Sequence, residues 1–361
     1  FWTPITPLTG SLLHADPQGC GRPMAHARSY LIADAIADYR LEVGDKRVSA
    51  DSIAARLNNV LDYLEASDRI AATCDQAAAL AEPMREWLAA QPVKSRSKNG
   101  TVTKTRPRTA ATVEEVLHQF RAALNHAHKR QRIEAPPQFI SRTRREVSPL
   151  RLARADVEQI AAMLRWAADP KWKRRGPLHA FLIGSICTLA RPNAIVDIST
   201  DSDRAQWQGN LLDLNPRGRV QTKKHRPIVP VPATLDRWLG EIQADPKSKG
   251  WLCQVAGEPV RSVKTAWDAM RNEVGFPKGP EWGTYILRHS LANLVRARGA
   301  TQWDLQGQMG HRVAGTTEIY AAGTLYITAQ TALASVLHDL ESIAPEALHR
   351  RRTGSEKGGA I

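Results

Sequence analysis

Through its first third the chain carries apolar residues at helical spacing, and this periodicity predicts a domain built from helices. The run from Ile53 through Leu57 to Leu64 repeats every three or four positions, which lines one face of a helix. Further stripes of this kind lie within residues 27–39, 76–90 and 110–130. Because no convincing strand interrupts them, we expect a compact all-helical domain over residues 27–135.

The rest of the chain mixes helical stripes with short strand-like runs. Helices are expected after a cap at Asp156 and over residues 177–190, 235–242, 263–274, 286–298 and 303–309. Strands are expected at 206–207, at 211–214, and in a hairpin that joins 219–222 to 227–231 around a cationic turn. The chain is therefore predicted to be mainly α with a small antiparallel β-sheet, and its second domain to be α+β.

A proline-marked basic stretch without periodicity separates the two parts. Pro136-Pro137 is followed by a run from Arg142 to Arg145, and irregular polar stretches of this kind are typical of domain boundaries. The predicted segments are an irregular lead-in at 1–26, a helical domain at 27–135, a basic linker at 136–149, an α+β domain at 150–343 and a basic disordered tail at 344–361.

The charge balance favours a polyanionic partner. Lys and Arg number 50 against 36 Asp and Glu, which gives a net charge of +14 and a pI near 9.9. Such an excess attracts nucleic acid by electrostatic attraction and counterion release; a generally basic proteome is the alternative explanation. No apolar run approaches the roughly 20 residues of a membrane helix, and four scattered cysteines indicate reduced thiols in a cytoplasm.

Cations gather between the third and fourth predicted helices, where residues 94–108 carry six cations and no acid. A second group ends the fourth helix and continues into the linker. The candidate phosphate contacts are Lys94, Arg96, Lys98, Lys104, Arg106, Arg108, Lys129, Arg130, Arg142 and Arg144. Such runs are usually solvated flexible loops, but the uncompensated charge favours contact with a DNA backbone.

Five separated elements of the second domain carry side chains suited to phosphate chemistry. They are Arg191 before a proline, Lys223-Lys224 at the hairpin turn, Tyr285-x-x-Arg288-His289, Met309-Gly310-His311, and Tyr320 nine positions after that histidine. Taken singly, each has an ordinary structural explanation, such as a salt bridge, a soluble turn or a helix cap. In this order they resemble the tyrosine recombinase, or phage-type integrase, superfamily over roughly residues 150–340. Residues 27–132 resemble the helical, SAM-like core-binding domain that precedes the catalytic domain in that family.

The resemblance implies a DNA strand transferase that cleaves and rejoins DNA through a 3′-phosphotyrosyl intermediate, without ATP, metal or another cofactor. Arg191 and Arg288 are implied to bind the phosphate oxygens, His311 to add a hydrogen bond and Tyr320 to attack phosphorus. Lys223, with Lys224 as the alternative, is implied to protonate the leaving 5′-oxygen. The implied setting is a bacterial or phage-encoded, nucleoid-associated cytoplasmic protein of a mobile element. It would act on double-stranded DNA as a homo-tetramer, with accessory DNA-bending proteins as possible partners.

Two positions depart from the family pattern. Tyr285 stands where the family usually has histidine, and we expect this phenol to line the site as a donor or orienter. Ala194 stands where the family often has an acid, so we expect orientation of Arg191 from elsewhere, with Asp197 as a candidate. A type IB-like topoisomerase and a non-catalytic DNA-binding relative remain as alternative functions.

A further stripe follows the tyrosine, formed by Leu333, Val336, Leu337 and Leu340. Two roles are open for a helix of this kind: docking on a neighbouring protomer, or packing back on its own domain.

Overall fold

The chain divides into two compact units, one on each side of the step from residue 150 to residue 151. The computed structural model describes residues 29–96, 99, 101–135, 138–148, 150–169, 175–311 and 325–350, of which 94–96 and 104 are described by their backbone alone. Each unit has a hydrophobic core of its own. In the described residues, no helix is long and apolar enough to cross a membrane.

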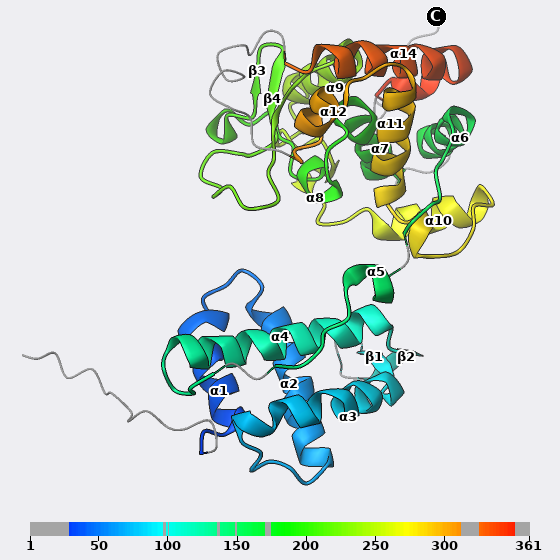
Figure 1. The fold of residues 1–361 in the computed structure, drawn as a ribbon. Coiled ribbons are helices and arrows are strands. Elements are labelled where there is room, and N and C mark those ends of the chain that lie inside the picture. Colours follow the sequence, from blue (N-terminus) through cyan, green and yellow to red (C-terminus); the bar gives the residue numbers. More distant parts are fainter. Residues whose placement is uncertain are drawn as a thin grey trace, which may run out of the picture. The chain divides into compact units, whose positions relative to one another are not determined.

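The first unit is a bundle in which one long helix, α4, packs against the four others (Figure 1). Its helices are α1 (Ile32–Tyr39), which continues as a π-helical turn over Arg40–Gly44, α2 (Ala50–Ala66), α3 (Ala77–Ala90), preceded by the 3₁₀ turn Cys74–Gln76, α4 (Ala110–Lys129) and the short α5 (Arg144–Val147). The periodic residues of α2 and α4 meet in the core, where Leu57 and Phe120 are fully buried. The predicted helices of this unit are thus present.

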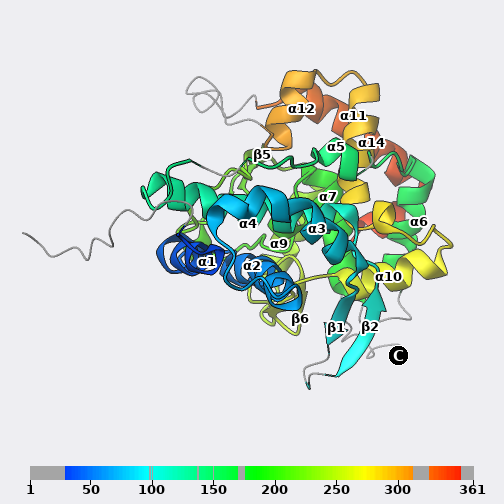
Figure 2. The same cartoon turned by 60° about the horizontal axis from the view of Figure 1, so that its bottom comes forward.

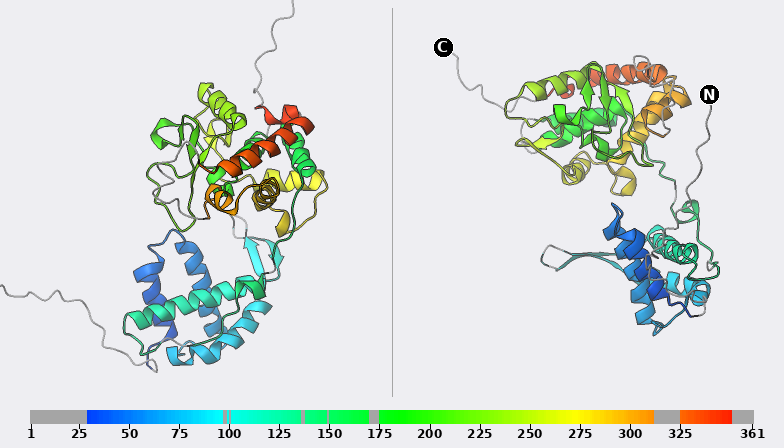
Figure 3. Two further views of the ribbon diagram at one scale, coloured as in Figure 1. Left: turned by 45° about the horizontal axis from the view of Figure 1, so that its top comes forward. Right: turned by 90° about the vertical axis from the view of Figure 1, so that its left-hand side faces the viewer.

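The expectation that this unit is all-helical is wrong in one place, because the cation-rich segment forms a β-hairpin. Strand β1 (Val93–Arg96) pairs antiparallel with β2 (Val102–Arg106), with a register shift between Ser95 and Arg96. The strands project from the helices of their unit (Figure 2 and Figure 3). The physical reason is the β-branched content of β2, in which Val102, Thr103 and Thr105 favour an extended strand.

The segment that the sequence marks as a linker is packed on this unit over its described part. Phe139 is buried and stacks on Phe120 with ring centroids 5.7 Å apart. Arg85, which forms a buried ion pair with Glu114 over 2.6 Å, also donates to the carbonyl of Ile140 over 2.8 Å. The chain is therefore fixed to the first unit until shortly before the second unit begins.

The second unit is built around α7 (Gly176–Thr188), which is buried on every face except at its first turn. The helices that surround it are α6 (Val157–Ala168), α8 (Pro192–Ile195), α9 (Ala233–Ala244), α10 (Lys264–Glu273), α11 (Tyr285–Ala297), α12 (Gln302–Gln308) and α14 (Ile327–Ile343). Single 3₁₀ turns cover Ser202–Arg204, Pro280–Trp282 and Pro345–Leu348. Helices α6, α9, α11 and α14 pack directly on α7 (Figure 1). The side-chain cap predicted at Asp156 is present.

A small antiparallel sheet flanks these helices in the order β3-β4-β5, from β3 (Trp207–Gln208), β4 (Leu211–Asp213) and β5 (Ile228–Pro230). Leu212 pairs with Val229 across β4 and β5. The predicted strand at 219–222 is wrong, since β5 pairs with β4 and residues 214–227 form a long connection between them. A separate ribbon pairs β6 (Gln254–Val255) with β7 (Glu258–Pro259).

The C-terminal segment is ordered farther than the sequence predicts. Disorder is expected over residues 344–361, but the chain remains packed on the second unit through Arg350. His179 donates to the carbonyl of Ala347 over 2.7 Å, and the Trp238 indole donates to that of Leu348 over 2.8 Å. Arg350 pairs with Asp245 at 2.8 Å. Two buried donors therefore use this segment's carbonyls as their acceptors.

Helix α14 packs on its own unit. Its stripe, which includes Leu333, Val336 and Leu340, is buried against α6, α11 and α12. The sequence leaves two roles open for this helix, docking on a neighbouring protomer or packing on its own domain. The structure shows it packed on its own domain.

Candidate active site

Arg288 is the most deeply buried cation of the second unit's motif residues, with only 4% of its surface exposed. It lies on α11 among buried apolar neighbours, so its guanidinium points into the protein. Nη1 donates to the carbonyl of Leu189 over 2.6 Å, and Nη2 donates to that of Met309 over 2.6 Å. Nη2 also lies 2.9 Å from Nε2 of His311. Arg288 thus connects three segments that are far apart in the sequence.

Arg191 is also held by main-chain carbonyls. It is the residue before α8, where Pro192 supplies the preset backbone angle of a first helical position. Its Nη1 donates to the carbonyl of His225 over 2.6 Å, and its Nη2 donates to that of Gly310 over 3.2 Å. The predicted grouping of Arg191, Arg288 and His311 is therefore present as one cluster.

Three of these carbonyl acceptors end helices. Leu189 is the left-handed residue (φ 55°) that terminates α7, and Met309 caps α12. Gly310, with φ 65°, completes a Schellman motif, in which His311 N donates to Gln306 O and Gly310 N donates to Gly307 O. Carbonyls at helix C-termini lack partners inside the helix and carry partial negative charge, so guanidiniums are their natural donors.

The cluster retains its positive charge, since carbonyl groups orient the arginines without neutralising them. In the described part of the chain, no carboxylate lies within ion-pair distance of Arg191 or Arg288. Burial, followed by the charge of Arg191, lowers the pKa of Arg288 to about 9. Burial, then Arg288 and Arg191, also lowers the pKa of His311. Binding of an anion to such a site is favourable, because the anion supplies the missing counter-charge.

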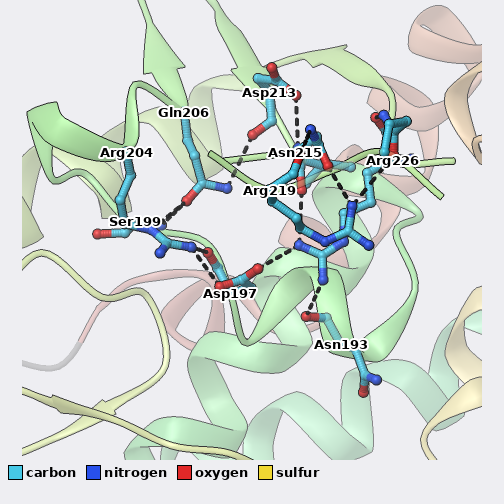
Figure 4. A network of polar contacts seen from close by, with 11 residues as sticks. Asn193, Asp197, Ser199, Arg204, Gln206, Asp213, Asn215, Arg219 and Arg226 are labelled. Carbon is cyan, nitrogen blue, oxygen red and sulfur yellow. Dashed lines mark hydrogen bonds and ion pairs between the residues drawn. The ribbon is translucent and has the colours of Figure 1, made fainter. Parts of the chain in front are cut away.

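Asp197 does not orient Arg191, contrary to the expectation from the sequence. Its carboxylate accepts from Arg204 Nη2 at 2.5 Å and from Arg226 Nη1 at 2.5 Å (Figure 4). The reason is geometric: the described donors of Arg191 are directed at main-chain carbonyls, and Asp197 lies beyond α8 among two other guanidiniums.

Lys223 and Lys224 both lie exposed at a bend of the connection between β4 and β5, which we call the lysine loop (residues 214–227). Their side chains can therefore move toward a ligand at the arginines. His225 follows them directly, and its carbonyl is the acceptor for Arg191. The loop is thus attached to the arginine cluster one residue after its lysines.

Tyr285 begins α11 with 41% of its surface exposed. Its electrostatic interaction with Arg191 and Arg288 opposes the lowering of their pKa by burial. Its ring lies 6.4 Å from that of His289, one helical turn later. Tyr320 lies outside the residues that the structure describes.

Comparison with known proteins finds matches among solved structures. No protein-family model matches the chain, and no curated protein matches it. Among solved structures, an integrase of the transposon Tn1549, in complex with circular intermediate DNA, aligns with TM-score 0.54 and 14% identity over 81% of this chain and 99% of that one. A lambda integrase dimer bound to a core site aligns with TM-score 0.54 and 12% identity over 81% of this chain and 78% of that one.

The chain has the tyrosine recombinase fold. The predicted fold class, an N-terminal helical domain followed by an α+β domain with a small antiparallel sheet, is confirmed by these neighbours. The fold accounts for the layout of the cluster, in which segments from α7, the lysine loop, α11 and α12 meet around two arginines.

The candidate phosphate contacts of the first unit differ in their surroundings. Arg106, Lys129 and Arg144 are exposed. Arg130 pairs with Glu42 at 2.8 Å, Arg142 lies 3.5 Å from Glu82, and the half-buried Arg108 donates to Gln91 O. Lys94, Arg96 and Lys104 lie on the hairpin strands, where only the backbone is described, and Lys98 lies outside the described residues.

The groups that sequence reasoning missed are mostly main-chain acceptors, together with one buried glutamine. Gln308 is 1% exposed; its Nε2 donates to Thr188 O over 3.2 Å, and its Oε1 accepts from Gln330 over 2.8 Å. It thereby fixes the end of α12 to the end of α7, where the acceptors of Arg288 lie. A single glutamine in a helix carries no pattern that would have identified it.

Proposed function

We propose that the protein is a site-specific DNA recombinase that cleaves and rejoins DNA through a phosphotyrosyl intermediate. The observation that carries this proposal is the pair of guanidiniums, Arg191 and Arg288, held by carbonyls and left without a carboxylate in the described chain. Two planar cations held in this way suit the non-bridging oxygens of one phosphodiester. The folds of two integrases, each solved with DNA, support the same substrate class.

In the proposed reaction, the phenol oxygen of Tyr320 attacks phosphorus while Arg191 and Arg288 stabilise the charge on the non-bridging oxygens. The new O–P bond replaces the bond to the 5′-oxygen, which leaves with a proton from Lys223; the phenol proton passes to solvent. His311 adds a hydrogen bond to the phosphate. Preorganised donors of this kind contribute several kcal/mol at the transition state, and the reverse attack by a 5′-hydroxyl rejoins the strand.

The proposal also covers the assembly of the enzyme on DNA and the kind of genetic element that it serves. The enzyme would act as a homo-tetramer on two duplexes, with DNA-bending proteins as possible accessories, and would serve a phage or other mobile element. The matches to a transposon integrase and to lambda integrase support that origin. The exposed cations of the first unit and the net charge of +14 support duplex binding.

The test uses a pool of nicked DNA duplexes that carry a randomised core of about 30 base pairs, because the recognition sequence is unknown. A nick beside the scissile phosphate lets the cut fragment diffuse away and traps the covalent adduct. After rounds of selection for denaturant-resistant capture, we expect adducts with the wild type and none with Tyr320→Phe. Enriched binding without any adduct would instead support the non-catalytic relative. Relaxation of supercoiled plasmid that lacks the selected site would support the topoisomerase.

A further inference from the structure

The lysine loop is closed at its base by the side chain of Arg226. Nη1 of Arg226 donates to the carbonyl of Leu214 over 3.2 Å and to Asp197 Oδ2 over 2.5 Å, while Nη2 lies 3.4 Å from Asn193 O. Leu214 is the first residue of the loop, so one guanidinium joins its two ends and ties both to the segment after Arg191 (Figure 4). The Arg226 side chain is only 13% exposed, which limits competition from water.

A second contact closes a smaller loop around the lysines themselves. Gln221 accepts from the backbone N–H of Arg226 at 3.1 Å and donates to the carbonyl of the same residue at 3.0 Å. The Gln221 side chain therefore bridges from the residue before the segment 222–225 to the residue after it. Lys223 and Lys224 lie at the centre of that segment. The Thr222 hydroxyl accepts from Lys224 N over 3.3 Å, which favours the bend.

This anchor adjoins the arginine cluster directly. His225, the residue before Arg226, presents its carbonyl to Arg191 at 2.6 Å. A shift of the Arg226 side chain would therefore move the lysines, while the carbonyl of His225 keeps its own hydrogen bond to Arg191. Asp197 opposes such a shift, since Arg204 holds its other oxygen at 2.5 Å and also lies over the ring of Trp251.

We propose that Asp197, Arg226 and Gln221 are positioning residues that set the reach of the lysine loop toward the leaving 5′-oxygen. The inference rests on the proposed function and adds a role to it: these side chains act through the lysine that donates the proton, not on the phosphate. The lysines are exposed and a lysine side chain has a flexible four-carbon stem, so loop position decides how often an ammonium group meets the 5′-oxygen. General acid catalysis of this kind contributes about 10²- to 10⁴-fold.

The experiment compares two substrates that differ in one atom. The selected nicked duplex is made with either oxygen or sulfur at the bridging 5′ position of the scissile phosphate. A thiolate leaves without protonation, so cleavage of the sulfur substrate does not need the lysine. With the full chain, we expect Arg226→Gln and Gln221→Ala to slow adduct formation on the oxygen substrate by about 10- to 100-fold. On the sulfur substrate we expect less than about 3-fold slowing, the pattern that a general-acid effect requires.

Two controls separate positioning from a general loss of structure. Arg204→Gln removes the other partner of Asp197 and leaves all contacts of Arg226 in place, so we expect a smaller dependence on the leaving atom than in Arg226→Gln. Arg226→Lys retains a cation near Asp197 and should recover part of the oxygen-substrate rate. Because Gln221 is exposed, Gln221→Ala keeps the buried network, and thermal unfolding confirms its fold.

Equal slowing of both substrates by Arg226→Gln and by Gln221→Ala would overturn the inference, because the residues would then serve phosphate binding or folding. The inference is also wrong if neither variant slows cleavage of the oxygen substrate. A wild type that forms no adduct with either substrate contradicts the proposed function itself, so the two failures are distinct.

Discussion

Arg288 and His311 share one hydrogen bond, 2.9 Å long between Nη2 and Nε2, and it determines the state of the imidazole. A guanidinium has only donors, so Nε2 of His311 must be the acceptor. The ring is therefore neutral and carries its proton on Nδ1, in agreement with its lowered pKa. The N–H on Nδ1 can then donate to an anion, which is the role proposed for this residue.

Acid should destabilise the second unit through its histidines. Burial, followed by neighbouring arginines, lowers the pKa of His225, His289 and His311 below the usual 6.5. The unfolded chain then binds more protons than the folded one below pH 6.5, so stability is retained above that pH and lost as the pH falls. We expect a lower Tm at pH 5.5 than at pH 7.5, and a smaller difference in Tm between the two pH values in His289→Gln. An unchanged difference in Tm in that variant would show that His289 does not contribute to the acid sensitivity.

DNA binding should weaken in base through Arg288. Its pKa of about 9 means that the free protein loses this charge as the pH rises from 8 to 10. The affinity of Tyr320→Phe for the selected duplex, measured by anisotropy at constant ionic strength, should fall through this range. A bound phosphate favours the charged form, so the affinity should begin to fall near the pKa of the free protein and continue to fall above it. The double variant Tyr320→Phe with Arg288→Gln should show a smaller change of DNA affinity over the same pH range.

Tyr285 offers a test of the departure from the family pattern. Its side chain is exposed and interacts electrostatically with both arginines, so we expect its hydroxyl to donate to a phosphate bound between them. Removing one hydrogen bond to a charged group costs about 1.5–3 kcal/mol, or about 10- to 100-fold in rate. Tyr285→Phe should slow adduct formation by that amount, and Tyr285→His should match or exceed the wild type. Undiminished cleavage by Tyr285→Phe would show that the phenol has no such role.

Sequence reasoning succeeded where a pattern has a spatial meaning. Helical periodicity predicted the bundle, a continuous apolar run predicted the buried α7, and the order of motifs implied that Arg191, Arg288 and His311 would meet. The expectation that Asp197 orients Arg191 was wrong, because main-chain carbonyls hold this arginine. Every residue has a carbonyl, so no sequence pattern indicates which carbonyl will be the acceptor. Sequence reasoning also missed the first hairpin, because the many lysines and arginines of this segment are typical of a solvated loop and its few β-branched residues give only a weak strand signal.

The exposed cations of the first unit should control the salt dependence of binding. Arg106 on the hairpin and Arg144 on α5 are exposed. Each phosphate contact adds about 0.9 to the magnitude of the slope of log K against log salt concentration. Arg106→Gln with Arg144→Gln should therefore reduce this magnitude by up to about 1.8. Arg56→Gln serves as the control, because Arg56 pairs with Glu115 in the same unit, and its slope should match the wild type.

Gly310 lies where the end of α12 meets the lysine loop, and both acceptors of Arg191 meet there. Its φ of 65° is left-handed, and an added Cβ would lie 2.6 Å from the carbonyl oxygen of His225 and 2.7 Å from Cδ of Pro227. Both atoms belong to rigid groups, so α12 and the loop would have to separate. Gly310→Ala should therefore displace both carbonyls that hold Arg191.

Gly275→Ala is the matched control, because Gly275 has φ 82° and an added Cβ would meet nothing within 4 Å. It isolates the backbone strain of a left-handed alanine, about 1 kcal/mol. We expect Gly275→Ala to lower Tm slightly and to form adducts at the wild-type rate. Gly310→Ala should lower Tm further and reduce adduct formation at least about 100-fold, since loss of one preorganised donor alone has an effect of that size. Similar rates for the two alanine variants would mean that Arg191 does not depend on this contact.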